Sequence, residues 1–180
     1  MDEVITRFLN SAAGGIPAID LPAVWAGKFG VPILVVLVAI QWWSRNERLH
    51  VRHACLSAGL SFLLGLGINQ VIIAFIHRVR PYDAGITHLI VEKSADWSFP
   101  SDHATASVSI AAAFALQRSP IRTALFALIA LIICLSRVYV GTHYVSDVLG
   151  GALVGICSAV LAKLVFRENS RLDRLATRIF

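Results

Sequence analysis

Charged residues are scarce in this sequence. Asp, Glu, Lys and Arg make up 15% of its 180 residues, whereas 57% are hydrophobic. Soluble globular domains carry about a quarter charged residues and about 45–50% apolar ones, so the composition excludes an ordinary soluble domain. The apolar residues also gather in runs that approach the roughly 20 residues needed to cross a bilayer, and the mean hydropathy is +0.71. The sequence therefore predicts an integral membrane protein.

The sequence also lacks the signals of several other architectures. No strand pattern and no internal repeat of roughly 20–50 residues is present, which leaves a single all-helical domain over residues 1–180. Three cysteines are too few for a full disulfide framework, and all fall within apolar runs. Residues 1–20 lack the basic start and compact apolar core of a cleavable signal. We expect Ile5, Phe8 and Leu9 to form one face of a short interfacial helix there.

Five apolar runs predict five transmembrane helices. They cover residues 21–43, 54–76, 104–116, 124–135 and 148–166. Lys28 interrupts the first run, and the third run is short unless its polar lead-in from Ser101 is counted. We therefore expect an all-α, polytopic membrane bundle of about five transmembrane helices plus an N-terminal interfacial helix.

Basic residues are concentrated on one side of the predicted bundle. With five spans, the loops after the first and third runs and the C-terminal tail share one face, and they hold ten of the sixteen Lys and Arg residues. The positive-inside rule makes this face cytoplasmic, which places the C-terminus in the cytoplasm. We attribute the net charge of +5 to this topology and to contact with anionic membrane lipids, because no basic domain stands outside the membrane to bind nucleic acid.

Polar residues that are distant in the sequence are predicted to meet at the opposite, outer face. Each of them lies at the outer end of a predicted helix, so the five-span topology places them at one membrane surface. A random scatter of polar residues would not converge in this way. The set consists of Arg80, Ser101, His103, Arg137, His143 and Asp147.

Part of this set suits a phosphate group. The guanidinium groups of Arg80 and Arg137 carry permanent charge and paired donors for phosphate oxygens. Ser101 opens a predicted helix, whose unpaired backbone N–H groups and positive dipole end favour an anion. We therefore expect these residues to bind phosphate.

The remaining residues supply the chemistry of phosphoryl transfer. His143 and Asp147 are four residues apart, so their side chains can meet on a helical turn. Such a carboxylate would fix the imidazole tautomer and leave the other ring nitrogen free to attack. His103 can then protonate a leaving oxygen, since an unperturbed histidine titrates near about pH 6.5. This set requires neither a metal nor a cofactor.

These residues resemble the signatures of the type 2 phosphatidic acid phosphatase superfamily. Residues 136–147 match its third signature, Ser-Arg-x5-His-x3-Asp, without a gap. "PSDH" at residues 100–103 looks like the second signature, and Arg80-Pro81 looks like the end of the first. The resemblance implies that His143 is a nucleophile that forms a phosphohistidine, that Asp147 orients it and that His103 protonates the leaving group. It also implies that Arg80, Arg137 and Ser101 hold the phosphoryl oxygens.

Within that superfamily, "SFPSDH" at residues 98–103 is most similar to the small bacterial undecaprenyl-diphosphatases. Those enzymes remove the terminal phosphate of undecaprenyl diphosphate during recycling of the lipid carrier for peptidoglycan synthesis, and they can confer bacitracin resistance. The resemblance implies the same lipid substrate here. It further implies a bacterial inner (cytoplasmic) membrane, with the active site facing the periplasm.

The sequence departs from the family pattern at two positions. The first signature begins with a lysine seven residues before its arginine, and Ile73 occupies that position here. We hypothesise that Arg78 or Lys93 supplies the missing cation to the phosphate. The residue after Ser101 is usually glycine and here is Asp102. We count Asp102 with the phosphate-binding residues, although it also suits the first turn of a helix as an acid favoured by the dipole.

Several alternatives are compatible with the sequence. Another lipid phosphate, such as phosphatidylglycerophosphate, phosphatidate or a lipid A phosphate, is the main alternative substrate. A phosphotransferase would share the first half of the mechanism, and a non-catalytic anion-binding or transport protein is the alternative from a different class. Taken singly, Arg80 or Arg137 also suits a snorkelling anchor. His143 with Asp147 also suits a surface pair, or two metal ligands, which are too few for a closed site.

Two further features have structural interpretations. Gly151 and Gly155 form a small-xxx-small spacing, which suits close helix packing either within the bundle or in a homo-oligomer. Asn69 and Gln70 lie inside the second run, where polar groups hydrogen-bond neighbouring helices or mark a functional cavity.

Overall fold

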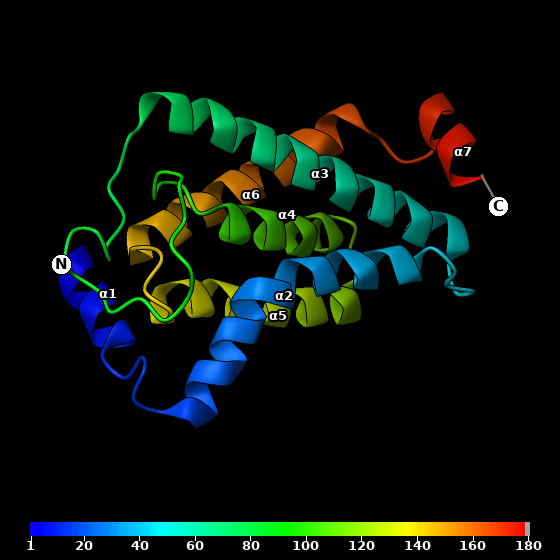
Figure 1. The fold of residues 1–180 in the computed structure, drawn as a ribbon. Coiled ribbons are helices and arrows are strands. Elements are labelled where there is room, and N and C mark those ends of the chain that lie inside the picture. Colours follow the sequence, from blue (N-terminus) through cyan, green and yellow to red (C-terminus); the bar gives the residue numbers. More distant parts are fainter. Residues whose placement is uncertain (179–180) are drawn as a thin grey trace.

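Seven helices make up the fold, and no strand occurs in the residues that the structure describes, 1–178. In this computed structural model the long helices run beside one another, while α1 and α7 lie at opposite ends of the bundle (Figure 1). The helices are α1 (Asp2–Asn10), α2 (Pro17–Gln41), α3 (Arg48–Phe75), α4 (Asp102–Leu116), α5 (Pro120–Tyr139), α6 (Val145–Val165) and α7 (Arg171–Thr177).

Four of these helices, α2, α3, α5 and α6, are long and apolar enough to cross a membrane. α4 has 15 residues and falls short of that length, yet it lies in the middle of the bundle and packs against α3, α5 and α6. The predicted all-helical, polytopic membrane bundle is confirmed. Helices α3 and α5 begin several residues before the apolar runs do, because each helix includes a polar first turn.

Close contact between α6 and α4 depends on two glycines. A Cβ atom on Gly151 would lie 2.5 Å from the carbonyl oxygen of Ser101, and one on Gly155 would lie 2.8 Å from that of Thr105. No side chain larger than hydrogen fits at such separations, so the two backbones can approach only because these positions are glycine. The small-xxx-small spacing thus serves a contact within the bundle.

α2 bends near its middle (Figure 1). Pro32 lies inside the helix and has no N–H to donate to the carbonyl of Lys28 four residues earlier, so the helix loses a hydrogen bond there. Gly30 packs against α5, where an added Cβ would lie 2.5 Å from Ile133 Cγ1. α2 therefore follows α5 closely and brings Gly27 alongside Arg137, at the end of α5.

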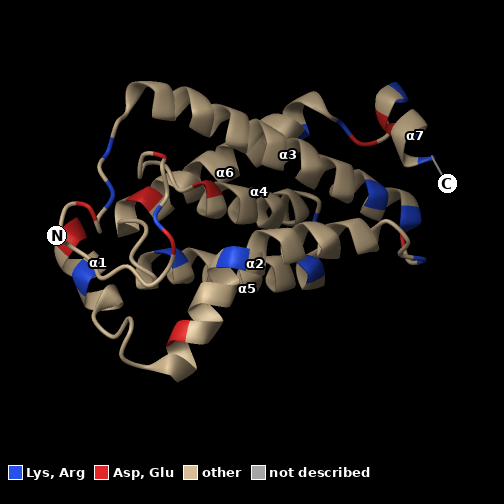
Figure 2. Ribbon diagram, viewed as in Figure 1, with Lys and Arg blue, Asp and Glu red and all other residues tan. Residues whose placement is uncertain are grey.

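A buried polar cluster attaches α7 to the other end of the bundle. His53 Nδ1 lies 2.8 Å from Asp173 Oδ1, and Arg52 Nη1 donates to the carbonyl oxygen of Thr177 over the same distance. The guanidinium of Arg52 also lies over the ring of Trp42. Many Lys and Arg residues gather at this end of the molecule (Figure 2), as the loop composition predicts.

Candidate active site

The α3–α4 connection and the α5–α6 turn enclose a cavity of about 110 Å³ at the end of the bundle that carries α1. Ser101 is the N-cap of α4, and its neighbours in the sequence, Pro100 and Asp102, both line the cavity. Ser101 is fully buried, and its hydroxyl oxygen has no hydrogen-bond partner among residues 1–178. Five residues predicted from the sequence line the cavity: Arg80, Asp102, His103, Arg137 and His143. The wall is completed by Ile73, Ser94, Asp96, Trp97 and Pro100.

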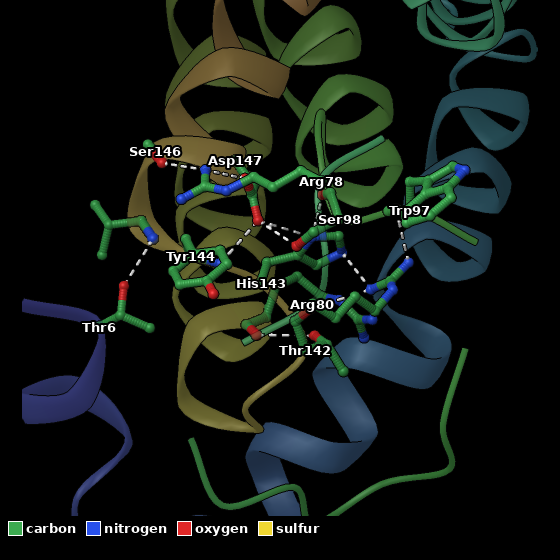
Figure 3. A network of polar contacts seen from close by, with 12 residues as sticks. Thr6, Arg78, Arg80, Trp97, Ser98, Thr142, His143, Tyr144, Ser146 and Asp147 are labelled. Carbon is green, nitrogen blue, oxygen red and sulfur yellow. Dashed lines mark hydrogen bonds and ion pairs between the residues drawn. The ribbon is translucent and has the colours of Figure 1, made fainter. Parts of the chain in front are cut away.

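His143 is held by hydrogen bonds at both ring nitrogens (Figure 3). Its Nδ1 lies 2.8 Å from the carbonyl oxygen of Ser98, and its Nε2 lies 3.3 Å from Arg80 Nη1. A carbonyl only accepts and a guanidinium only donates, so the proton is assigned to Nδ1 and the lone pair to Nε2. Burial lowers the pKa of His143 below its ordinary value of 6.5, and the charges of Arg137 and Arg80 lower it further, against the opposing effect of Asp147. The imidazole is therefore neutral, with an unprotonated Nε2.

Asp147 is fully buried and accepts three hydrogen bonds. Arg78 Nη1 donates to Oδ1 over 2.6 Å, the Tyr144 backbone N–H donates to Oδ2 over 2.9 Å, and the hydroxyl of Ser98 also donates to Oδ2. His143 Nδ1 is 3.7 Å from Oδ2, which is within ion-pair range but longer than a hydrogen bond. The predicted i,i+4 pair thus meets, but the Nδ1 hydrogen bond goes to Ser98. Ser98 connects the two residues, although no local sequence pattern marks it as a site residue.

Arg80 ties the walls of the cavity together. Its guanidinium donates to the carbonyl oxygens of Asp96, Thr142 and Trp97 and to the hydroxyl of Ser94. These bonds join the α3–α4 connection to the α5–α6 turn and aim one nitrogen at His143 (Figure 3). Arg137 comes from the last turn of α5, and its buried Nε has no hydrogen-bond partner in the described chain. The cavity therefore holds one anchored guanidinium and one with donor capacity to spare.

Asp102 places a carboxylate in the wall of the cavity. Its Oδ1 accepts a hydrogen bond of 2.6 Å from Asn69 Nδ2, which also donates to Thr105 Oγ1 over 2.9 Å. Asn69 is fully buried, and these two hydrogen bonds join α3 to α4.

Within residues 1–178, no three His, Cys, Asp or Glu side chains are grouped to hold a metal ion.

Arg78 lies behind Asp147, outside the lining of the cavity. Its second nitrogen, Nη2, is 2.7 Å from Asp2 Oδ2, and its guanidinium stacks on the ring of Tyr144 at 3.9 Å. Burial alone would lower the pKa of Arg78, but its bonds and charge interactions with Asp2 and Asp147 raise it overall. Arg78 is thus positioned to neutralise the buried carboxylate of Asp147.

Comparison with known proteins shows where this architecture belongs. A sequence model of the PAP2 superfamily matches residues 54–171, which is more than half of the chain. The chain belongs to the PAP2 superfamily. It is 35% identical over 143 residues to undecaprenyl-diphosphatase BcrC of Bacillus subtilis, covering 79% of this chain and 70% of that protein.

Further relatives extend the similarity within the PAP2 superfamily. Phosphatidylglycerophosphatase B of Bacillus subtilis is 30% identical over 170 residues, covering 87% of this chain and 74% of the relative. The crystal structure of a PAP2-type phosphatidylglycerolphosphate phosphatase from the same organism superposes with a TM-score of 0.69 at 25% identity, covering 94% of this chain and 86% of that one. The protein is accordingly a multi-pass membrane enzyme and a lipid phosphatase.

The position of the missing lysine of the PAP2 pattern lies at the catalytic cavity. Ile73, at the place of the usual lysine, lines the cavity. Neither of the two residues expected to replace that lysine lines the cavity. Arg78 is engaged by Asp2 and Asp147, and Lys93 is largely exposed and pairs with Asp83 at 3.0 Å.

Helix α1 is attached directly to the turn that carries His143. Asp2 accepts a hydrogen bond of 3.0 Å from the Ser146 N–H, and Thr6 Oγ1 accepts one of 3.1 Å from the Val145 N–H. Burial alone would raise the pKa of Asp2, but hydrogen bonds from Ser146 and Arg78 lower it below 3.8. An ionised Asp2 therefore holds both Ser146 and Arg78, and the sequence offered no signal for this contact.

Proposed function

We propose that this enzyme removes the terminal phosphate of an isoprenoid lipid diphosphate, converting undecaprenyl diphosphate to undecaprenyl phosphate. The observation that carries the proposal is the hydrogen bonding of His143, which leaves Nε2 unprotonated and facing a cavity lined by Arg80 and Arg137. The similarity to BcrC over 79% of the chain supports the choice of lipid.

The first half of the reaction transfers the phosphoryl group to the enzyme. The terminal phosphate binds Arg80, Arg137, the free hydroxyl of Ser101 and the unpaired N–H groups at the start of α4. Arg80 moves its hydrogen bond from Nε2 to a phosphate oxygen, which frees the lone pair. The bond from Nε2 to phosphorus forms as the bond to the bridging oxygen breaks. The leaving lipid monophosphate takes the electron pair of that bond and a proton from His103. Burial and the charge of Arg137 lower the pKa of His103 to about 3 before substrate binds, and the negative charge of the bound diphosphate raises it, so that His103 carries the proton it donates.

The second half releases phosphate. His103, now neutral, accepts a proton from a water molecule that attacks the phosphorus of the phosphohistidine. The bond from Nε2 to phosphorus breaks, and its electron pair returns to His143. The Ser98 carbonyl and the charge of Asp147 stabilise the cationic ring during both halves, at 2.8 Å and 3.7 Å from Nδ1.

The proposed location is a bacterial inner membrane, with the active site facing the periplasm. The end of the bundle with α7 carries many of the basic residues (Figure 2), which suits the cytoplasmic side. The C-terminus is then cytoplasmic, and the lipid head group reaches the site from the outer leaflet.

A phosphatidylglycerophosphate phosphatase is the second candidate. The similarity in fold to such an enzyme covers 94% of this chain with a TM-score of 0.69. The same two-step mechanism would apply, because the residues that line the cavity bind and transfer a phosphoryl group in either case.

Phosphate release from purified enzyme tests the proposal. Undecaprenyl diphosphate, phosphatidylglycerophosphate, phosphatidate and a lipid A phosphate are each supplied to the wild type, to His143→Ala and to His50→Ala. The first substrate should turn over fastest, and His143→Ala should lose more than about 10³-fold in kcat. His50→Ala is the matched control, since His50 pairs with Glu168 at the far end of the molecule. Full activity of His143→Ala contradicts the mechanism, and preference for another lipid contradicts the substrate.

A further inference from the structure

A second cavity, of about 340 Å³, lies between α2 and the connection that precedes α4. It shares Arg137 with the catalytic cavity, so the two are neighbours across one guanidinium. Lys28 adds a cation of this cavity's own beside the shared Arg137, and Glu92 adds a carboxylate. Val24, Gly27 and Val91 complete the wall with apolar surface. This combination suits an anionic group joined to an apolar chain.

Lys28 is the cation that interrupts the first apolar run. A charged residue in a membrane helix is costly and is a candidate for function. The helix also brings it close to the catalytic centre, because its neighbour Gly27 lies against Arg137. An added Cβ at Gly27 would be 2.9 Å from Arg137 Nη1. Pro32 also has no N–H to donate to the Lys28 carbonyl, so this part of α2 lacks one helical hydrogen bond.

The catalytic cavity by itself has little positive charge for a diphosphate. Its wall holds two arginines, Arg80 and Arg137, and two aspartates, Asp96 and Asp102, so the permanent charges cancel. Ile73 stands where a further cation is usual in the superfamily. A diphosphate carries more negative charge than a monophosphate, so its second phosphate requires a cation outside this wall.

We infer that the second cavity binds the lipid-proximal phosphate of a lipid diphosphate, and that Lys28 determines the preference for diphosphates over monophosphates. This inference rests on the proposed phosphatase function and specifies how its substrate is selected. The two phosphorus atoms of a diphosphate share one oxygen, so the proximal phosphate must lie directly beside the terminal one. Arg137, between the cavities, contacts both phosphates, and Lys28 contacts the proximal one.

This arrangement also assists the chemical step. When the bridging P–O bond breaks, negative charge develops on the departing lipid monophosphate. Lys28 and Arg137 stabilise that charge at the moment it forms. Lys28 therefore affects kcat for diphosphates. The leaving group of a lipid monophosphate is an uncharged alcohol, so Lys28 has no negative charge to stabilise there.

Substituting Lys28 tests the inference. Lys28→Gln should lose about tenfold in kcat/KM on undecaprenyl diphosphate, the loss expected for one charge-assisted contact. On a lipid monophosphate such as phosphatidate it should change less than about twofold, since no proximal phosphate is present. Lys28→Arg should restore most of the diphosphate activity. Lys163→Gln is the matched control, because Lys163 bonds the Leu116 carbonyl at the other end of the bundle.

Inhibition by soluble anions separates this inference from the proposed function. Methylenediphosphonate should inhibit the wild type more strongly than inorganic phosphate does, and Lys28→Gln should abolish that difference, whichever lipid phosphate is used as the substrate. An equal loss on both lipid substrates, or an unchanged inhibitor ratio, overturns the inference and leaves Lys28 as an interfacial anchor. A wild type that releases no phosphate from lipid diphosphates overturns the proposed function, while the inhibitor ratio still decides whether the second cavity binds a diphosphate.

Discussion

The orientation of His143 depends on Ser98 as much as on Asp147. The Ser98 carbonyl accepts the Nδ1 proton, and the Ser98 hydroxyl donates to the carboxylate that balances the ring's charge. Arg78 donates to the same carboxylate from the opposite side. Because Asp147 is fully buried, removing its charge would leave the Arg78 cation paired with Asp2 alone. His143 is therefore positioned by a small network of hydrogen bonds and charges.

Substitutions at Ser98 and Asp147 should separate orientation from charge. Ser98→Ala keeps the carbonyl and loses only the hydroxyl, so we expect kcat to fall about tenfold. Asp147→Asn removes the charge that stabilises the cationic ring, and we expect kcat to fall about 10³-fold. Single-turnover trapping of phosphoenzyme from labelled substrate measures both. A larger loss in Ser98→Ala than in Asp147→Asn would contradict this division of roles.

The pH dependence of activity should report His143. Protonation of Nε2 removes the nucleophile, so activity is lost as the pH falls through the pKa of His143. That pKa lies below 6.5, because burial and the charges of Arg137 and Arg80 lower it against the effect of Asp147. The acid limb of kcat/KM should therefore lie below pH 6.5.

Variants of Arg80 provide the control for this assignment. Arg80→Gln should move the acid limb to higher pH, whereas Arg80→Lys keeps a positive charge and should shift it less. The position of the limb is read independently of the activity that either variant loses through weaker phosphate binding. An acid limb above 6.5 in the wild type would contradict the assignment to His143.

Site residues could be predicted from the sequence where they belong to one short segment with a recognisable spacing. The spacing from Arg137 to His143 and Asp147 falls within one short stretch, from the last turn of α5 to the first turn of α6, so it can be read from the sequence. Ser98 and Asp2 approach this turn only through tertiary packing, and no local pattern marks them. Arg78 and Lys93 were expected near the phosphate because of their charge, but carboxylates engage both of them elsewhere.

At the scale of elements, α1 acts as a brace for the active-site turn. Its outward residues Val4 and Phe8 are exposed, which suits contact with the membrane interface. Leu9, which was expected on the same apolar face, is half-buried and packs inward. The side chains of Asp2 and Thr6 accept hydrogen bonds from the backbone N–H groups of the first residues of α6. The brace therefore fixes the segment that follows His143.

Weakening the brace should reduce turnover without changing the phosphate site. Asp2→Asn loses the charge that holds Arg78 and Ser146, so we expect kcat to fall several-fold, about 3–10-fold, with little change in KM. Glu3→Gln is the control, because Glu3 is exposed on the same helix. Equal kinetics of Asp2→Asn and the wild type would show that α1 only anchors the chain.

Packing between α4 and α6 should tolerate no added side chain. Gly151→Ala places a Cβ against the Ser101 carbonyl, and this overpacking should cost about 1–3 kcal/mol and lower the Tm in detergent. Gly67→Ala in α3 is the matched control, since an added Cβ there meets nothing within 4 Å. A helix interior favours alanine over glycine, so Gly67→Ala should be neutral or stabilising. An unchanged Tm in Gly151→Ala would contradict the close approach.

For the whole molecule, the apolar runs predict the helical bundle and its membrane location well. Hydrophobic length is a property of the local sequence, and four of the five runs correspond to helices long enough to span. The end at which the site forms also follows from counting spans. Helix ends and the paths of the connections were not predictable, because they depend on contacts such as those of Arg80 with residues 94–97.

Opposite ends of the bundle should be accessible from opposite sides of the membrane. With the native cysteines replaced by serine, Lys93→Cys lies beside the active site and should react with an impermeant maleimide on intact cells. Arg171→Cys, at the start of α7, should react only after the cells are permeabilised, since basic segments stay in the cytoplasm. Reaction of both in intact cells, or the reverse pattern, would contradict the proposed orientation.

The shortness of α4 also bears on how the chain enters the bilayer. A segment of 15 residues that includes Thr105, Ser107 and Ser109 gains little from partitioning into lipid by itself. Its stable insertion must await the arrival of α5 and α6 from the ribosome, because those helices cover its polar side chains. The enzyme would then acquire its chemistry late in biogenesis, when the hairpin of α5 and α6 encloses α4.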